Sequence, residues 1–159
     1  MKQLTPQEAV LSIMRFAAEE PPGRVYLLME IGRFNFLRRK ALRNSFSTLV
    51  LFLWKLSIRE AHPDTASQVV GTWNDLMEVA YSNSRSLLTA IQRDIERYSS
   101  AMNHSGSKTF EQVALQFVTL VKGKQSDNIA YAARLCVEIE DLYAWLLRTA
   151  KTYEVVLRK

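Results

Sequence analysis

Apolar residues recur at helical spacing along most of the chain, and the most regular run lies near the C-terminus. Between residues 127 and 159 the apolar positions alternate in steps of three and four, the a/d pattern of a coiled coil. We call the following positions the C-terminal seam: Ile129, Ala132, Cys136, Ile139, Tyr143, Leu146, Ala150 and Tyr153. We expect this seam to pack against another helical surface, supplied by a protein partner or by a second copy of this chain.

A second long amphipathic run covers residues 65–102. Its apolar positions keep three-four spacing except for the series Ala80, Ser84 and Leu88, which steps by four and shifts the apolar stripe around the helix. This pattern predicts one continuous helix, which at roughly 1.5 Å per residue would be about 57 Å long. Paired with the C-terminal helix, it would form a long antiparallel hairpin over residues 64–159.

The N-terminal part of the chain is predicted to hold further helices. Thr5, Pro6 and Glu8 have the types and spacing of a capping box with proline in the first turn. Two prolines and a glycine at residues 20–23 end the helix that follows. Helical periodicity is clear again over residues 34–61, where the following side chains share one side of a helical wheel: Leu42, Phe46, Leu49, Leu53 and Leu56.

Glycine and proline are rare, at five and four of 159 residues, and they separate the periodic segments instead of interrupting them. Together the patterns predict an all-α fold, a helical bundle of five to six helices that includes the long antiparallel hairpin. We expect a single helical domain over residues 1–159, with basic helices over residues 1–60 and the hairpin over residues 64–159.

Charge is distributed unevenly along the chain. Residues 1–60 hold 10 Lys and Arg against 5 Asp and Glu, whereas residues 61–159 hold 11 of each kind, so the net charge of +5 resides in the first segment. No acidic residue lies between Glu30 and Glu60. We call the cations near the start of that stretch the basic cluster: Arg33, Arg38, Arg39, Lys40 and Arg43.

The basic cluster predicts an anionic partner, because a patch of one sign concentrates opposite charge and guanidinium groups bind phosphates and carboxylates. On charge alone, a nucleic-acid backbone, an acidic protein and an anionic membrane surface all suit it; the solvated face of a buried helix is the alternative without function. Phe34 and Phe36 can stack on unpaired bases or belong to the core. No nucleic-acid recognition motif accompanies the charge, so we expect no reading of base sequence.

The longest apolar run, Leu49–Trp54, has six residues, and a transmembrane helix needs roughly 20. No apolar leader segment follows Met1, and the single cysteine allows no intramolecular disulfide. We therefore expect a cytoplasmic protein without a transmembrane segment. A membrane surface is the least favoured of the three anionic partners.

Candidate catalytic groups are few. Two histidines and one cysteine cannot form a conventional zinc site without carboxylates, and Cys136 lies on the apolar seam, where it is more simply a buried hydrophobe than a nucleophile. The sequence has no glycine-rich phosphate loop and no nucleophile elbow. We expect no enzyme activity, no metal and no cofactor. The sequence predicts a helical adaptor subunit of a larger assembly, or alternatively a helical protein that binds nucleic-acid phosphates without sequence specificity.

Two segments resemble known families. The tripeptide His62-Pro63-Asp64 between two predicted helices resembles the loop with which J-domain co-chaperones stimulate Hsp70, which would imply an Hsp70 partner. Apolar residues 51–54 precede it where that family has a basic helix, and the tripeptide also suffices to end one helix and begin the next. The amphipathic span over residues 69–157 resembles, in periodicity, the phasins that coat polyester granules; such coating needs apolar surface left over after bundling.

Overall fold

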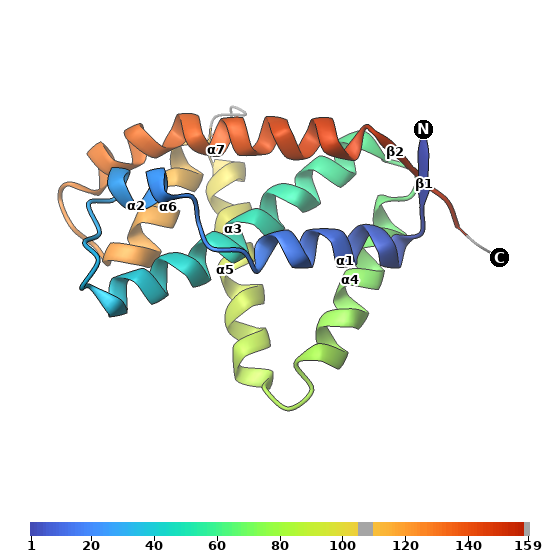
Figure 1. Ribbon diagram of the computed structural model, residues 1–159, viewed down its shortest axis with the longest axis horizontal. Helices are drawn as coiled ribbons and strands as arrows, with labels where there is room; N and C mark the ends of the chain where they lie inside the picture. The colour runs from blue at the N-terminus through green and yellow to red at the C-terminus, as the bar shows by residue number, and fades with distance from the viewer. Residues whose placement is uncertain (105–109, 158–159) are drawn as a thin grey trace.

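The structure is a computed structural model, and it describes residues 1–104 and 110–157 (Figure 1). Within these ranges the chain forms seven helices: α1 (Pro6–Ala17), α2 (Gly23–Leu28), α3 (Phe36–Ala61), α4 (Ala66–Ala80), α5 (Arg85–His104), α6 (Glu111–Lys122) and α7 (Asn128–Ala150). Two three-residue strands, β1 (Lys2–Leu4) and β2 (Tyr153–Val155), lie on either side of them in the chain. The all-α prediction is confirmed, although the described residues form seven helices instead of five to six.

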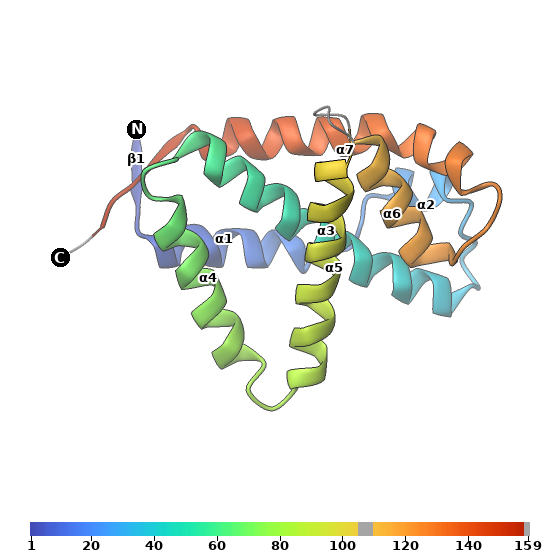
Figure 2. The ribbon, with the colours of Figure 1, turned by 180° about the vertical axis from the view of Figure 1, so that it is seen from behind.

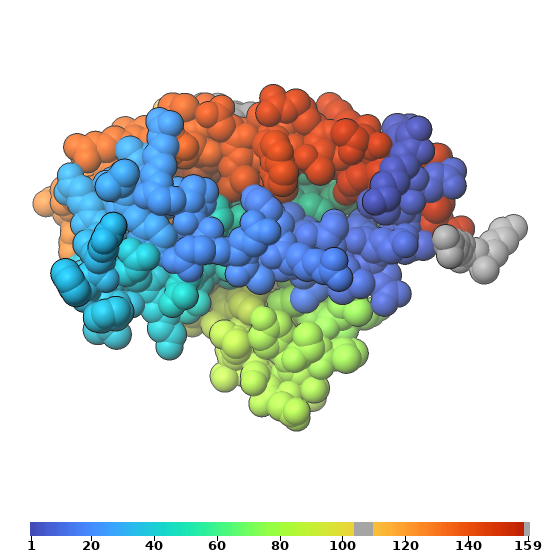
Figure 3. Space-filling view, in the orientation of Figure 1, coloured from blue at the N-terminus to red at the C-terminus, as the bar shows by residue number. Residues whose placement is uncertain are grey.

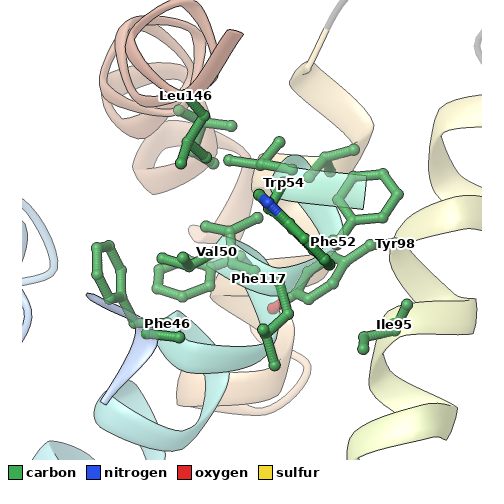
Figure 4. Close-up of a cluster of buried hydrophobic side chains, with 14 of the residues drawn as sticks. Phe46, Val50, Phe52, Trp54, Ile95, Tyr98, Phe117 and Leu146 are labelled. Atoms are coloured by element: carbon green, nitrogen blue, oxygen red, sulfur yellow. The ribbon is translucent and has the colours of Figure 1, made fainter. Parts of the chain in front are cut away.

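Helix α3 crosses the middle of the molecule and contacts α1, α4, α5, α6 and α7 (Figures 1 and 2). Its middle turns are buried on all sides, as expected of a central helix that is apolar around its circumference. In Figure 4 its side chains meet Tyr98 of α5, Phe117 of α6 and Leu146 of α7. The rings of Phe52 and Tyr98 lie 5.6 Å apart between centroids. Helix α3 is therefore the core element against which five other helices pack, namely α1, α4, α5, α6 and α7.

Helix α1 begins as the sequence predicts. The Thr5 hydroxyl oxygen accepts a hydrogen bond from the backbone N–H of Glu8 at 3.3 Å, and the Glu8 carboxylate accepts one from the N–H of Thr5 at 2.8 Å. The predicted capping box is thus confirmed, with Pro6 in the first turn. The helix ends before the two prolines, and it packs on α3 and α4.

The strands β1 and β2 were not predicted. They pair in parallel, with Lys2 opposite Tyr153 and Leu4 opposite Val155. The N–H of Val156 continues the ladder by donating to the carbonyl oxygen of Leu4 at 2.9 Å. This pairing holds the two ends of the described chain together at one end of the molecule (Figures 1 and 2).

The prediction of one continuous helix over residues 65–102 is wrong. The chain forms α4 and α5 there and reverses direction between them (Figure 1). At this turn the N–H of Ser84 donates to the carbonyl oxygen of Tyr81 at 2.8 Å, and the carbonyl oxygen of Ser84 accepts from the N–H of Leu88 at 3.2 Å. The step of four at Ser84 marks the place where one apolar stripe ends and another begins, because the serines and asparagine of residues 82–84 favour turns over helix interiors.

The long antiparallel hairpin is absent for the same reason. Both α5 and α7 pack against α3 and α6, and α4 and α5 diverge from their shared turn (Figures 1 and 2). Because the chain turns back at residues 81–84, the apolar stripe of α5 reaches the body of the molecule instead of extending along α7. The described helices therefore form a compact bundle around α3.

The C-terminal seam is mostly buried inside the chain. Helix α7 carries all of its members except Tyr153, which lies in β2, and packs against α3 and α6. Tyr143 is half-buried, and Ile129 is exposed. The other six members are buried: Ala132, Cys136, Ile139, Leu146, Ala150 and Tyr153. Most of the seam is therefore covered by other parts of the same chain. Ile129, which is 71% exposed, is the member most open to a partner.

Candidate functional site

The basic cluster lies where α3 begins, at the end of the molecule far from the chain termini (Figures 1 and 2). After α2 the backbone takes the left-handed conformation at Glu30, with φ of 53°, and Ile31 is buried. The chain then turns through residues 32–35 into α3. The side-chain oxygen of Asn35 accepts a hydrogen bond from the N–H of Arg38 at 3.2 Å and so caps the helix. These local bonds fix where the turn and the first residues of α3 lie.

Three large apolar side chains of this segment are open to water. Phe34 is 89% exposed, Phe36 74% and Leu37 84%. Phe34 belongs to the turn, and the other two begin α3. In Figure 3 this part of the chain, coloured light blue to cyan, lies at the lower left of the surface. Exposed apolar clusters of this kind mark surfaces that bind proteins, membranes or ligands.

Three arginines of the basic cluster are held by contacts within the protein. The guanidinium of Arg38 donates to the last carbonyl oxygen of α6 at 3.3 Å. That of Arg39 lies 4.1 Å from the centroid of the Tyr26 ring and 3.7 Å from the Glu20 carboxylate, which also pairs with Arg43 at 3.5 Å. Burial, together with a hydrogen bond to Glu20, raises the pKa of Tyr26 to about 12. These arginines therefore fasten α3 to α6 and to the segment between α1 and α2.

The other two cations of the cluster are available to a partner. Arg33 and Lys40 are exposed, and neither forms an ion pair within the described residues. Together with the three apolar side chains they make up a surface that we call the basic-apolar tip: Arg33, Phe34, Phe36, Leu37 and Lys40.

The nearest acidic residue in the chain is bound to α7. The Glu30 carboxylate accepts a hydrogen bond from the hydroxyl of Tyr131 at 2.6 Å and pairs with Arg134 at 3.4 Å. These two contacts, that of Tyr131 first, lower the pKa of Glu30. The carboxylate thus remains ionised, but its charge is compensated by Arg134 and not by the cations of the tip.

Sequence reasoning left Phe34 and Phe36 open between core and surface, and the structure exposes both. It missed Leu37. The helical wheel held a usable signal, because Leu37 lies about 140° away from Leu42 at roughly 100° per residue, on the side opposite the buried stripe. Of the basic cluster, the structure brings Arg33 and Lys40 together with these apolar side chains and assigns the remaining arginines to internal contacts.

Metal-ligating side chains and Cys136 are the next candidate groups. The described residues contain no group of three or more His, Cys, Asp or Glu side chains placed to hold a metal ion. Cys136 is buried, and its thiol donates to Glu140 at 3.5 Å. Burial first, then this hydrogen bond, raises the pKa of Cys136 to about 11, so the thiol stays protonated and unreactive near neutral pH.

An apolar pocket of about 330 Å³ lies among α1, α2, α3, α6 and α7, with Phe46, Leu49 and Phe117 in its wall. Two carboxylates of its lining, Glu20 and Glu138, are already paired with arginines, the latter with Arg24 at 2.8 Å. Among its described lining residues there is no Ser, Cys, His or Lys. The other acidic side chains of its lining are Glu19 and Asp141.

The tripeptide His62-Pro63-Asp64 lies at a helix boundary, as its capping interpretation predicts. Helix α3 ends at Ala61 and α4 begins at Ala66, although the start of α4 has no side-chain cap. The imidazole of His62 is engaged within the fold, where its Nε2 lies 2.8 Å from a carbonyl oxygen at the end of α7.

No known protein family, no curated protein and no solved structure matches this chain. None of the helices in the described residues is long and apolar enough to cross a membrane. Function is therefore inferred from the basic-apolar tip.

Proposed function

We propose that this chain is a helical interaction subunit without enzymatic activity, and that it binds an anionic partner through the basic-apolar tip. The observation that carries this proposal is the exposure of three large apolar side chains beside Arg33 and Lys40, two cations without an acidic partner in the described residues. Apolar side chains supply binding free energy when a partner covers them, and the cations select a partner of negative charge.

The proposed binding surface uses two of the five cations of the basic cluster, Arg33 and Lys40. Arg38, Arg39 and Arg43 already have contacts within the protein, so a partner would compete with those contacts for them. No acidic residue occurs over residues 31–59, and the two acidic residues that most closely precede this stretch, Glu20 and Glu30, are paired with arginines. An anionic partner therefore meets little repulsion there.

Nucleic acid is the second candidate partner. The rings of Phe34 and Phe36 are 89% and 74% exposed, and exposed aromatic rings can stack on unpaired bases. Such binding would be largely insensitive to base sequence, since stacking and backbone contacts read shape and charge.

A panel of three polyanions tests the proposal at low salt: vesicles that contain phosphatidylglycerol, single-stranded RNA and poly-glutamate. We expect the native chain to bind at least one of them, and the double variant Arg33→Gln/Lys40→Gln to bind it several-fold more weakly. The matched control is Arg85→Gln/Lys151→Gln, which removes one exposed arginine and one exposed lysine elsewhere and should leave binding unchanged. Absence of binding to all three, or equal loss in both variants, refutes the proposal.

A further inference from the structure

We infer that the anionic partner is a lipid bilayer with a negatively charged surface, and that the basic-apolar tip enters its headgroup region. This inference rests on the proposed function and names the class of partner. It concerns the partner that the sequence favours least, and the exposure of Phe34, Phe36 and Leu37 is the observation that reverses the preference.

The chemistry of the apolar side chains distinguishes a bilayer from a nucleic-acid strand. Phenylalanine rings can stack on nucleic-acid bases, but Leu37, which is 84% exposed, is aliphatic and cannot. The boundary between headgroups and acyl chains takes both kinds of side chain, because burial there depends on apolar area and not on ring geometry. A mixed group of two aromatic rings and one leucine therefore fits a bilayer better than an unpaired strand.

The number of free cations points the same way. A nucleic-acid strand is held by a track of cations along its phosphates. In the basic cluster only the side chains of Arg33 and Lys40 lack a hydrogen bond or ion pair within the described residues, since Arg38 binds a carbonyl oxygen of α6 and the other two arginines pair with Glu20. Peripheral binding to a membrane needs two weak signals together, apolar insertion and attraction to anionic lipids. The tip combines both.

The position of the tip suits a flat surface. It lies at one end of the molecule, opposite the chain termini, and α3 runs from it into the body (Figures 1 and 2). The first turn of α7, which holds the exposed Ile129, lies at the same end. A bilayer can thus approach the tip end-on, and Ile129 would be the next apolar side chain near the surface.

Co-sedimentation with vesicles tests the inference. We expect the native chain to bind vesicles of phosphatidylcholine mixed with phosphatidylglycerol, and to bind phosphatidylcholine alone far more weakly, with binding reduced at high salt. The double variant Arg33→Gln/Lys40→Gln should weaken partitioning about 25-fold, which is about fivefold for each cation removed. The variant Phe34→Ser/Leu37→Ser should weaken partitioning at least about tenfold, because serine gains much less free energy than phenylalanine or leucine on moving from water into the bilayer.

Matched controls keep these effects specific. Val79 is 74% exposed on α4, so Val79→Ser removes an apolar side chain of similar exposure away from the tip. The charge control is again Arg85→Gln/Lys151→Gln. Both controls should bind vesicles as the native chain does. Because all these positions are exposed, folding should be unchanged, which circular dichroism and thermal unfolding verify.

Insertion can be measured directly with Phe36→Trp. The native tryptophans Trp54 and Trp73 are 3% and 1% exposed, and Trp145 is 41% exposed, so the change is read as a difference from the native spectrum. On anionic vesicles the added tryptophan should shift its emission to the blue and be quenched by brominated lipid. The native chain should show little of either change.

The outcomes separate the inference from the proposed function. Binding to RNA or poly-glutamate through the same residues, without binding to anionic vesicles, overturns the inference and leaves the proposed function standing. Vesicle binding that depends on Arg33 and Lys40 but not on Phe34 and Leu37 also overturns it, because nothing would then enter the bilayer. Binding to none of the polyanions refutes both.

Discussion

The Nε2 atom of His62 lies 2.8 Å from the carbonyl oxygen of Ala150. The imidazole also stacks on the ring of Tyr153, with 5.3 Å between centroids. These contacts join the end of α3 to the end of α7, beside the point where β2 pairs with β1. An imidazole with its proton on Nε2 donates this hydrogen bond. His62 therefore links the ends of α3 and α7 through its side chain.

Replacing His62 tests this structural role. His62→Ala removes both contacts and leaves the carbonyl oxygen of Ala150 without its side-chain donor, so the free energy of unfolding should fall by about 1–3 kcal/mol. Urea denaturation measures the change. Asp64 is exposed, and Asp64→Asn should change stability by less than about 0.5 kcal/mol. A larger loss in Asp64→Asn than in His62→Ala would contradict this assignment.

The C-terminal seam should act on stability and not on assembly. Leu146 is 4% exposed, so Leu146→Ala should lower the free energy of unfolding by about 2–5 kcal/mol through lost burial and a cavity. Ile129→Ala, at an exposed member of the same seam, should cost less than about 0.5 kcal/mol. Light scattering should give the same molar mass for both variants and the native chain. A mass that drops in Leu146→Ala would show that the seam joins subunits.

Cys136 should react slowly with alkylating reagents. Its raised pKa of about 11, against 9.0 for the free group, makes the thiolate about a hundredfold rarer at pH 8. Since the folded-state value is the higher one, the neutral thiol contributes stability that is complete below pH 9 and is lost as pH rises toward 11. Iodoacetamide labelling at pH 8 should be slow in buffer and fast in urea. Equal rates would show that the thiol is accessible in the folded chain.

Lys55 should make the free energy of unfolding rise with pH, whereas Cys136 should make it fall. Its ammonium lies 3.6 Å from the centroid of the Trp73 ring, and burial, followed by Arg59, lowers its pKa from 10.5 to about 8. Between these values the unfolded chain binds more protons, so the cost of the charge is full below pH 8 and disappears as pH rises to 10.5. Thermal unfolding should therefore show that Lys55→Met is most favourable, relative to the native chain, at pH 7 and less so at pH 10. A difference in Tm that does not vary with pH would contradict the shift.

The sequence predicts structure well where neighbouring residues decide it. The capping box at Thr5 and Glu8 depends on a four-residue spacing, and the structure forms it. The side of α3 that carries Leu42 and Leu53 is likewise set by helical geometry, and both residues are fully buried. The turn at residues 81–84 was missed because a step of four in the apolar pattern fits a shifted stripe as well as a reversal of the chain.

The remaining features depend on contacts between distant parts of the chain. The pairing of residues 2–4 with residues 153–155 leaves no trace in the local pattern of either segment. The basic cluster was visible in the sequence as charge. Which of its cations lack an ion pair depends on Glu20, which lies between α1 and α2 and pairs with Arg39 and Arg43 of α3. Periodicity also cannot say whether a coiled-coil seam is filled by another chain or, as here, largely by α3 and α6.

The parallel pairing of β1 with β2 has a practical consequence. Because it keeps the first and last described strands at the end opposite the basic-apolar tip, an affinity handle fused at either terminus would anchor the molecule with that surface pointing away from the support (Figures 1 and 2). Immobilising the chain through each terminus in turn should thus give the same orientation on a sensor chip.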